Sequence, residues 1–404
     1  MDKRDFTVLI LGSDMNAYYM ARCYHELYNC NADMMAKSFS GATKYTKIIN
    51  KILIPNNNDS AVLMSLNKYA SDSNFNKILL IATSDKTVRQ IVEMKDKLDK
   101  KFIFNYPSLE IVNNLLIKAD FYRKYSSKLN LPKTLIYSCN RNDEIKVDFQ
   151  YPIILKPSNN IEYHNHEFSN MSKVYKVNSE KELWEIISKI RNSGYKDELI
   201  IQEFVPGGDD SLFDAVFYCG KDKKVKLMTF AQIGLQERTN TGVGNCTVLV
   251  NGFSEYGYDE NIIIKMQNFL EEIGYQGFAE FDLKYDIRDK SYKVFEINPR
   301  QARSSYYLTA CGYNLVKYLI DDLIYEKNTE TKLIKDKMLL TFVPKYVIRK
   351  YINSIPLKKE IENLIKLGKF TRPLHYSKDN SIIRKIFLFI RDLNYISKYR
   401  KFTF

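Results

Sequence analysis

The run Val294-Phe-Glu-Ile-Asn-Pro-Arg300 constrains this chain more than any other part of its sequence. Apolar and polar residues alternate along it, which predicts a strand that the proline ends. Glu296 and Asn298 are two residues apart, so both side chains point to the same face of that strand. A carboxylate and an amide carbonyl side by side are oxygen ligands of the kind that Mg²⁺ prefers. Arg300 and Arg303 follow, and guanidinium groups beside such ligands suit a phosphate or a carboxylate handled at a metal.

A second predicted strand supports this interpretation. The segment 277–285 also alternates and places Asp282 on one face, and the polar residues 286–290 predict a hairpin turn. Strands joined by such a turn pair as neighbours, which would bring Asp282 to Glu296 and Asn298. The alternative is a surface hairpin whose charged residues are solvated, the usual state of any single Asp or Glu. We favour a site because the carboxylates, the amide and the arginine occur together.

These two strands, with the ending Glu-Ile-Asn-Pro-Arg, resemble the metal-binding end of the ATP-grasp family, whose members use ATP to join a carboxylate to an amine through an acyl phosphate. The resemblance implies that Asp282, Glu296 and Asn298 hold Mg²⁺, as two ions, with Mn²⁺ as an alternative. It also implies that Arg300 and Arg303 stabilise the acyl phosphate. No Ser-His-Asp or Cys-His nucleophile is required by such a reaction.

Length and composition favour a cytoplasmic enzyme with more than one domain. The 404 residues predict two or three domains, and a hydrophobic content of 45% with 27% charged residues is ordinary for a globular protein. The charged start of the chain predicts no signal peptide, and no apolar run approaches the roughly 18 residues of a membrane span. Six scattered cysteines without close pairs indicate reduced thiols. We therefore expect a cytoplasmic protein.

The first quarter of the chain predicts a doubly wound α/β domain. An apolar strand over 6–11 is followed by a glycine turn and a helix with Ser13 or Asp14 as its cap. The further elements expected here are strands over 78–82 and 102–104 and a helix over 84–97. The glycine turn lacks the GxGxxG spacing of a dinucleotide site.

Two lysines are candidate phosphate contacts. Lys156 ends an apolar strand over 151–156, where an ammonium group is costly unless it meets an anion. The alternative is a surface lysine with only its stem buried. Lys118 precedes a helix that leads to Leu131-Pro-Lys-Thr134, and an ordinary lysine of an amphipathic helix is its alternative. The ATP-grasp resemblance implies that both lysines contact the phosphates of ATP.

An apolar strand that runs into a Pro-Gly-Gly turn is the candidate nucleotide hinge. The ATP-grasp resemblance implies that it links two lobes and binds the adenine edge through Glu203, Phe204 and Val205. An acidic residue beyond the glycines would take the ribose hydroxyls. Asp210 is our candidate, and the sequence leaves Asp209 open as the alternative. A polar turn between strands is the plainer interpretation of the two aspartates.

The polar loop 236–244 carries Arg238 and two glycines. Beside a metal site such a loop could close over the substrate, with Arg238 as a third catalytic arginine. It could equally be a plain long connection.

A narrower resemblance concerns the substrate. The opening segment 11–22 and the glycine-free loop 158–171 are similar to bacterial ATP-grasp ligases of the D-aspartate ligase kind. That resemblance implies an amino-acid carboxylate as one substrate and an amine of a cell-envelope precursor, in peptidoglycan synthesis, as the other. The alternatives are a ligase for a different amine, in capsule or another polysaccharide or in a small peptide, and an ATP-binding protein that does not ligate.

These segments predict an α/β chain, α+β in its core, with the ATP-grasp fold. The expected parts are a doubly wound pre-ATP-grasp domain over 1–112, a lobe with the phosphate-contacting lysines over 113–205, a lobe with the metal site over 206–328 and a basic helical extension over 329–404.

The net charge of +13 is concentrated at the end of the chain. Residues 331–404 hold 18 Lys and Arg against 5 Asp and Glu, whereas the rest of the chain is neutral, with 43 of each sign. Helices are expected over 345–355, 357–367 and 381–395. The apolar residues that recur at helical spacing in the last of them are Ile382, Ile383, Ile386, Phe387 and Ile390.

This extension allows two interpretations. In one, the apolar stripe packs on the enzyme and the basic face is solvated. In the other, the basic face meets an anion, either the inner membrane surface or a nucleotide-linked precursor. A nucleic-acid partner is not indicated, because the region lacks a recognised binding module. The oligomeric state stays open, a homodimer included.

Overall fold

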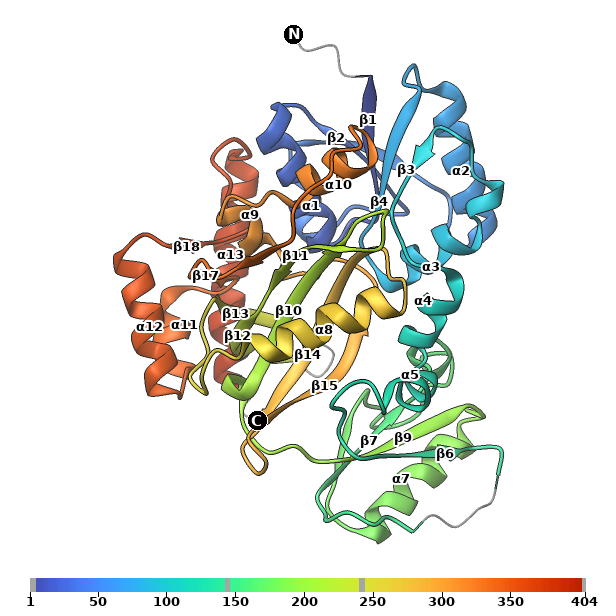
Figure 1. Cartoon of the computed structure of the whole chain (residues 1–404), viewed down its shortest axis with the longest axis vertical. Coiled ribbons are helices and arrows are strands. Elements are labelled where there is room, and N and C mark those ends of the chain that lie inside the picture. The colour runs from blue at the N-terminus through green and yellow to red at the C-terminus, as the bar shows by residue number, and fades with distance from the viewer. Residues whose placement is uncertain (1–4, 142–145, 240–243, 402–404) are drawn as a thin grey trace.

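A computed structural model of the chain describes residues 5–141, 146–239 and 244–401. The first part is a parallel sheet in the order β3-β2-β1-β4-β5, drawn in blue in Figure 1. Its elements are β1 (Phe6–Leu11), α1 (Met15–Tyr28), β2 (Ala32–Ala36), β3 (Ile49–Leu53), α2 (Asp59–Asp72), β4 (Lys77–Ala82), α3 (Asp85–Glu93) and β5 (Phe102–Ile103). The expected doubly wound domain is confirmed, and Asp14 caps α1 by accepting a hydrogen bond from the Ala17 amide. The pattern analysis missed β2, β3 and α2.

A small antiparallel sheet in the order β6-β9-β7-β8 forms the lobe at the lower end of the molecule (Figure 1). Two helices lead into it and two accompany it. The elements are α4 (Leu109–Leu116), α5 (Lys118–Tyr125), β6 (Thr134–Ser138), β7 (Ile153–Pro157), α6 (Asn160–Tyr163), β8 (Tyr175–Val177), α7 (Glu180–Asn192) and β9 (Glu198–Glu203). The apolar side of α7 packs on this sheet, so the lobe has a core of its own.

The largest sheet runs through the centre in the order β15-β14-β10-β12-β13-β17-β18, with β11 paired to β10 and β16 paired to β11. Helix α8 covers one face, while α9, α10 and α1 cover the other. The elements are β10 (Leu212–Cys219), β11 (Val225–Thr229), β12 (Ala231–Gln236), β13 (Cys246–Asn251), α8 (Glu260–Glu272), β14 (Gly277–Asp286), β15 (Ser291–Asn298), α9 (Tyr306–Ala310), α10 (Leu315–Leu323), β16 (Lys332–Ile334), β17 (Met338–Thr341) and β18 (Phe370–Thr371).

The sequence pattern of residues 225–232 predicts one continuous strand, and this prediction is wrong. The buried Phe230 separates two strands, of which β11 pairs with β10 and β16, and β12 pairs with β10 and β13. The ring of Phe230 stacks on Phe213 at 4.9 Å, and its carbonyl accepts from the Gly252 amide. Packing of this ring overrides the alternation that predicts one continuous strand.

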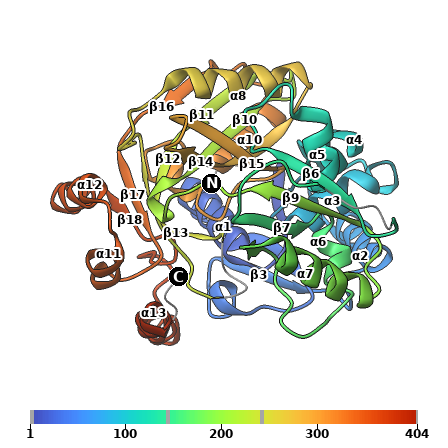
Figure 2. The ribbon, with the colours of Figure 1, turned by 90° about the horizontal axis from the view of Figure 1, so that it is seen from below.

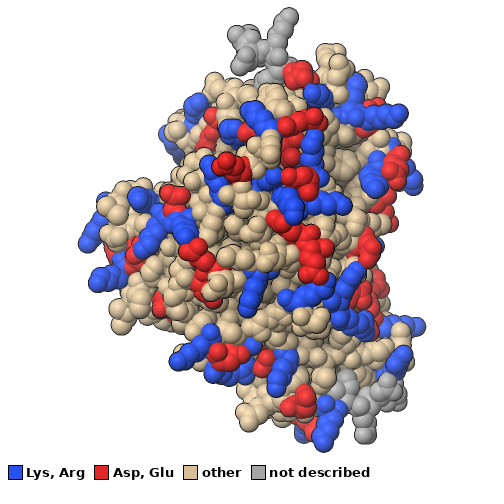
Figure 3. All heavy atoms as spheres, in the orientation of Figure 1, with Lys and Arg blue, Asp and Glu red and all other residues tan. Residues whose placement is uncertain are grey.

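The C-terminal part departs from the expected helical extension. Its helices are α11 (Lys345–Tyr351), α12 (Ile355–Lys366) and α13 (Ile382–Lys401), but β16, β17 and β18 join it to the central sheet. One of the two interpretations, in which the apolar stripe of the last helix packs on the enzyme, is wrong for most of the stripe, because Ile382, Ile383, Ile386 and Ile390 are exposed while Arg384 is fully buried. On the face drawn in Figure 3, basic and acidic side chains are intermixed, so the excess charge forms no continuous patch there.

Candidate active site

The hairpin of β14 and β15 carries the predicted metal ligands. The two strands pair antiparallel, with Asp282 opposite Glu296 and Glu280 opposite Asn298, so the expected pairing is confirmed. Asn298 donates hydrogen bonds from Nδ2 to Glu280 Oε2 at 2.6 Å and to Asp282 Oδ2 at 3.2 Å. Its Oδ1 accepts from Arg300 Nη2 at 3.3 Å. Cross-strand pairing thus collects three acidic side chains and one amide on one face of the hairpin.

A further carboxylate, Asp214 on β10, lies opposite Asp282 on β14. Burial raises the pKa of Asp214 to about 6. Burial also raises the pKa of Glu280 and of Asp282 well above the ordinary carboxyl value, and the neighbouring carboxylates add to the effect in both. The cluster therefore holds more negative charge than its surroundings compensate.

This donor set suits a divalent cation. Carboxylate and amide oxygens are the ligands of Mg²⁺, and a cation would offset the buried charge that raises these pKa values. Among the residues that the structure describes, no group of three or more His, Cys, Asp and Glu side chains is arranged to hold a metal ion. Asp282, Glu296 and Asn298 would be a set of two carboxylates and one amide, completed by other ligands.

Lys118, at the start of α5, joins this cluster. Its Nζ donates to Glu296 Oε2 at 2.5 Å, and its backbone amide donates to the Ser158 carbonyl. The Lys118 ammonium holds the pKa of Glu296 at about 2. The structure thus brings the predicted phosphate contact Lys118 against a predicted metal ligand.

Lys156, on β7, is buried with no carboxylate at ion-pair distance among the described residues. Its Nζ lies 3.2 Å from Gln202 Oε1 and 3.3 Å from the Tyr122 hydroxyl. Burial, followed by the charge of Lys118, lowers the pKa of Lys156 to about 7. A buried ammonium with neutral partners alone is stabilised by an anion, which is the property that a phosphate site requires.

The candidate nucleotide hinge follows β9, between the small antiparallel sheet and the central sheet. Glu203 already has partners: Oε1 accepts from the Lys133 amide at 2.8 Å, and Oε2 pairs with Arg288 Nη2 at 2.9 Å. It borders a cavity of about 490 Å³. Val205 is buried. The ammonium groups of Lys176 and Lys284 lie over the ring of Phe204.

The two hinge aspartates differ in their partners. Asp209 Oδ2 accepts from Arg238 Nη2 at 3.1 Å and from the Gln236 amide at 3.0 Å. Asp209 therefore anchors the loop that carries Arg238, of which 240–243 lie outside the described residues. Burial raises the pKa of Asp210, and the charge of Asp209 raises it further.

The two arginines after β15 contact different parts of the molecule. Arg300 Nε lies 2.8 Å from Asp85 Oδ1 at the start of α3, which ties the site to the N-terminal domain. Arg303 Nη1 donates to Glu237 Oε2 at 2.9 Å. The Nε and Nη2 atoms of Arg303 are buried and have no hydrogen-bond partner in the described residues.

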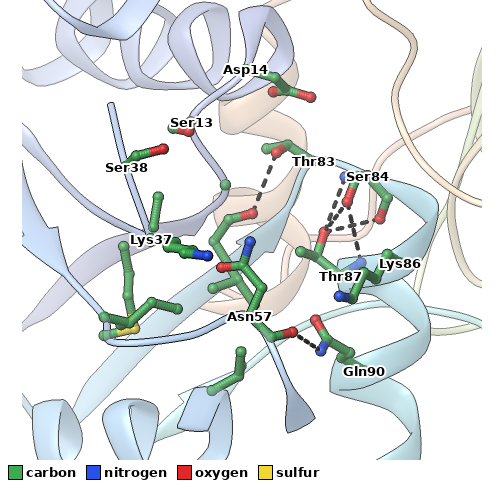
Figure 4. Close-up of a pocket in the computed structure, with 16 residues that line it drawn as sticks. Ser13, Asp14, Lys37, Ser38, Asn57, Thr83, Ser84, Lys86, Thr87 and Gln90 are labelled. Carbon is green, nitrogen blue, oxygen red and sulfur yellow. Dashed lines mark hydrogen bonds between the residues drawn. The ribbon is translucent and has the colours of Figure 1, made fainter. Parts of the chain in front are cut away.

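A cavity of about 250 Å³ opens at the carboxyl ends of β1, β2 and β4 (Figure 4). Two of its lining residues, Ser84 and Lys86, flank Asp85, the partner of Arg300. Ser13 and Asp14 line it from the start of α1, and the charge of Arg300 acts on Asp14. Lys37 follows β2 and Lys86 lies on α3. In open α/β sheets this edge is where ligands bind.

The sequence analysis missed four members of the site, Asp85, Asp214, Glu237 and Glu280. Glu280 was detectable, because it lies two residues before Asp282 on an alternating strand. Asp85 and Glu237 were not, since only the tertiary fold brings them to Arg300 and Arg303.

The fold and the site define a protein of the ATP-grasp class. The chain is similar to the L-amino acid ligase from Bacillus licheniformis, with a TM-score of 0.56 and 15% identity, covering 79% of this chain and 74% of that one. It is also similar to N5-carboxyaminoimidazole synthetase from Staphylococcus aureus, with a TM-score of 0.57 and 13% identity, covering 82% and 79%. These likenesses establish the fold, although no family model matches the chain.

The chain belongs to the D-aspartate ligase family. It is 33% identical to the D-aspartate ligase of Enterococcus faecium (strain Aus0004) over an alignment of 416 positions that covers 100% of this chain and 98% of the relative. It is therefore an ATP-dependent carboxylate–amine ligase of the ADP-forming, carbon–nitrogen bond-forming class.

Proposed function

We propose that the chain joins the side-chain carboxylate of a D-aspartate-like amino acid to an amine of a cell-envelope precursor. The observation that carries the chemistry is the meeting of two unmatched sets of charge, the buried carboxylates of the hairpin and the buried Lys156. A phosphate with its metal would satisfy both sets. The name of the Enterococcus relative supports the choice of amino acid, and the resemblance to envelope ligases supports the amine.

The chain's own residues divide the handling of ATP between the lobes. Lys156, with Lys118, would bind the phosphates, because it is a buried cation without an anion. Glu203, Phe204 and Val205 would hold the adenine edge. Asp210 would take the ribose, since Asp209 is already held by Arg238. Asp282, Glu296 and Asn298 would hold Mg²⁺, as two ions or replaced by Mn²⁺. The metal would supply positive charge to offset that of the β- and γ-phosphates.

The arginines would handle the acceptor side. The substrate carboxylate attacks the γ-phosphorus, ADP leaves, and an amine then displaces phosphate from the acyl phosphate. Arg300 would stabilise the charge of that intermediate. Arg303 has two buried donors without partners, which suit a second carboxylate of the amino acid in a bidentate contact. Arg238 would close over the substrate with its loop.

The cavity at the carboxyl ends of β1, β2 and β4 would receive the amino acid or the amine, because Asp85, the partner of Arg300, lies between two of its lining residues. Since ATP is a cytoplasmic metabolite, we place the reaction in the cytoplasm. The boundaries after residues 112, 205 and 328 remain our proposal for the domains of the chain.

Phosphate release tests the proposal. The purified protein is incubated with ATP, Mg²⁺, hydroxylamine and each of a panel of amino acids. We expect phosphate release and hydroxamate formation with D-aspartate and less with L-aspartate or glycine. Hydroxamate reports an activated carboxylate without any need for the natural amine. ATP binding without turnover on any amino acid would identify a non-ligating ATP-binding protein, and release with another amino acid would correct the substrate.

A further inference from the structure

The last helix, α13, turns its apolar side to solvent. Ile382 is 76% exposed, Phe389 64% and Ile386 54%. We call this side the outer face of α13, and its residues are Ile382, Ile383, Ile386, Phe389, Ile390 and Leu393. Figure 2 shows the helix end-on at the periphery of the molecule. Isolated exposed apolar residues are common, but six on one side of one helix form a contiguous surface of the kind that marks an interaction site.

The inner side of α13 packs on the enzyme through polar groups as well as through Leu388, Tyr395 and Tyr399. Arg384 forms a buried ion pair with Asp379 at 2.9 Å, and Arg391 donates to the Phe342 carbonyl at 3.1 Å. Lys398 pairs with Glu237 at 3.0 Å. Tyr395 and Tyr399 are buried in the core beside α11 and α12. These buried contacts hold α13 in one orientation, with its apolar side outward.

Exposed cations surround the outer face. Lys385 lies on the helix itself, Lys378 precedes it, and Arg400 and Lys401 end it. Acidic residues do not balance them among the described residues of this segment, because Asp379 is buried and Asp392 pairs with Arg372 at 2.7 Å.

The N-terminal domain adds to this rim. The ring of Tyr45 lies 5.7 Å from that of Phe387, and the Lys47 amide donates to Asp379. The exposed Lys44 and Lys47 therefore lie beside the start of α13.

We infer that the outer face of α13 inserts into an anionic membrane surface. A helix of 20 residues is about 30 Å long, and with one apolar side and a cationic rim it can lie in the plane of the lipid headgroups. Among the described residues no helix is long and apolar enough to cross a bilayer, so the contact is one of lying on the surface. Anionic lipid attracts the rim as well as the apolar face.

Charge distinguishes this partner from a second copy of the chain. A symmetric dimer through the same face would bring two cationic rims together, which opposes association. The inference concerns where the ligase works and stands apart from the identity of its substrates. It also places the reaction near the lipid, because Lys398 of the same helix holds Glu237, the partner of Arg303.

Binding to vesicles tests the inference. The full-length protein is sedimented with phosphatidylcholine vesicles with and without phosphatidylglycerol, at low and at moderate salt. We expect binding to the anionic vesicles alone, weakened by salt. Ile386→Ser combined with Phe389→Ser should reduce the partition at least about tenfold, because both side chains leave water on insertion. The matched control is Met64→Ser combined with Ile264→Ser, which removes exposed apolar residues on α2 and α8 and should change nothing.

A second variant gives a gain of signal. Phe389→Trp adds an indole on the outer face, and its fluorescence should shift to the blue with anionic vesicles, relative to wild type with its single Trp184. Unchanged partition of the Ser variant, or no spectral shift, would overturn the inference. A dimer that the Ser variant dissociates, without vesicle binding by wild type, would overturn it in favour of a second copy. Hydroxamate formation in every variant confirms that the protein is folded and separates this test from that of the substrates.

Discussion

The helix α13 and the hairpin of β14 and β15 both place charged side chains where water is excluded. On α13 the charge is matched. Arg384 and Asp379 are both 0% exposed and paired at 2.9 Å. The Ala42 carbonyl accepts from Arg384 Nη1 and the Leu374 carbonyl from Nη2, and the Tyr18 and Thr46 hydroxyls donate to Asp379.

On the hairpin the charge is not matched. Asp214, Glu280 and Asp282 are buried together, and burial raises the pKa of all three, with neighbouring carboxylates adding to the effect in Glu280 and Asp282. Lys156 is the opposite case, a buried ammonium whose pKa is lowered by burial and by the charge of Lys118. The comparison separates two uses of buried charge. Buried charges that are paired with each other fix one arrangement of the chain. Buried charges without a counter-charge instead favour binding of a ligand of the opposite charge.

The largest effect is expected where the matched pair is broken. Asp379→Asn should lower the free energy of unfolding by about 3–5 kcal/mol, because Arg384 would remain buried without its counter-charge. Denaturant unfolding measures the loss. Asp392→Asn breaks the half-exposed pair with Arg372 and should cost about 1 kcal/mol or less. The folded fraction of both variants should retain ligase activity. Equal losses of unfolding free energy in the two variants would show that the buried pair contributes no more to stability than the pair of Asp392 and Arg372.

The hairpin should respond more in rate than in stability, because the pair that Glu296 forms with Lys118 is partly exposed. Glu296→Gln keeps the shape of the side chain and should lower ligation at least about 100-fold while the fold stays intact, because positioned metal charge is worth several kcal/mol. Glu272→Gln, in the exposed pair with Lys128, is the control and should be neutral. A Glu296→Gln protein with full activity would remove this residue from the metal set.

The sequence was most informative where one strand carries a chemical pattern. Alternation placed Glu296 and Asn298 on one face, and a polar turn implied the partner strand with Asp282; the register confirms both. Lys156 was also found, because an ammonium at the end of an apolar strand needs an anion. Which of these residues touch ATP, metal or substrate remains a prediction.

Patterns failed where tertiary contacts decide. Asp85 reaches Arg300 from another domain, and no local signal announces it. The stripe on α13 predicted an inward apolar side by the ordinary rule for surface helices. That rule assumes that a helix buries its apolar side, and here the buried pair of Arg384 and Asp379 fixes the opposite face. The sequence of a helix does not determine which side faces the protein when each side carries residues that could be buried.

The two sides of the active site can be separated by binding. Lys156→Ala should weaken ATP binding about 10- to 100-fold, the worth of a charged contact. Arg300→Ala should bind ATP nearly as wild type and fail in turnover, since Arg300 lies beyond the metal ligands. Titration of a fluorescent ATP analogue measures both. Arg300→Ala leaves Asp85 unpaired, so the double variant with Asp85→Asn controls for that charge. Equal loss of ATP binding in both single variants would place Arg300 at the nucleotide.

The smallest effect is a pH dependence that follows from the unmatched lysine. Burial, with the charge of Lys118, lowers the pKa of Lys156 to about 7, and bound phosphate would raise it again. Below pH 7 the ammonium is present before ATP binds, so its contribution to the affinity is constant. Above pH 7 the free protein is largely neutral at Lys156, and ATP binding must take up a proton. The affinity should therefore fall by up to about tenfold for each pH unit above 7, until the raised pKa of the complex is reached.

Calorimetry in two buffers of different ionisation enthalpy measures that proton uptake directly. Lys156→Arg keeps its charge at every pH used, so its affinity should lose the pH dependence and its titration should show only the protons of ATP itself. The difference in proton uptake between wild type and Lys156→Arg gives the contribution of Lys156. Identical proton uptake in the two proteins would mean that Lys156 is charged throughout, and that the region around it supplies an anion of its own and is a matched network like that of Arg384.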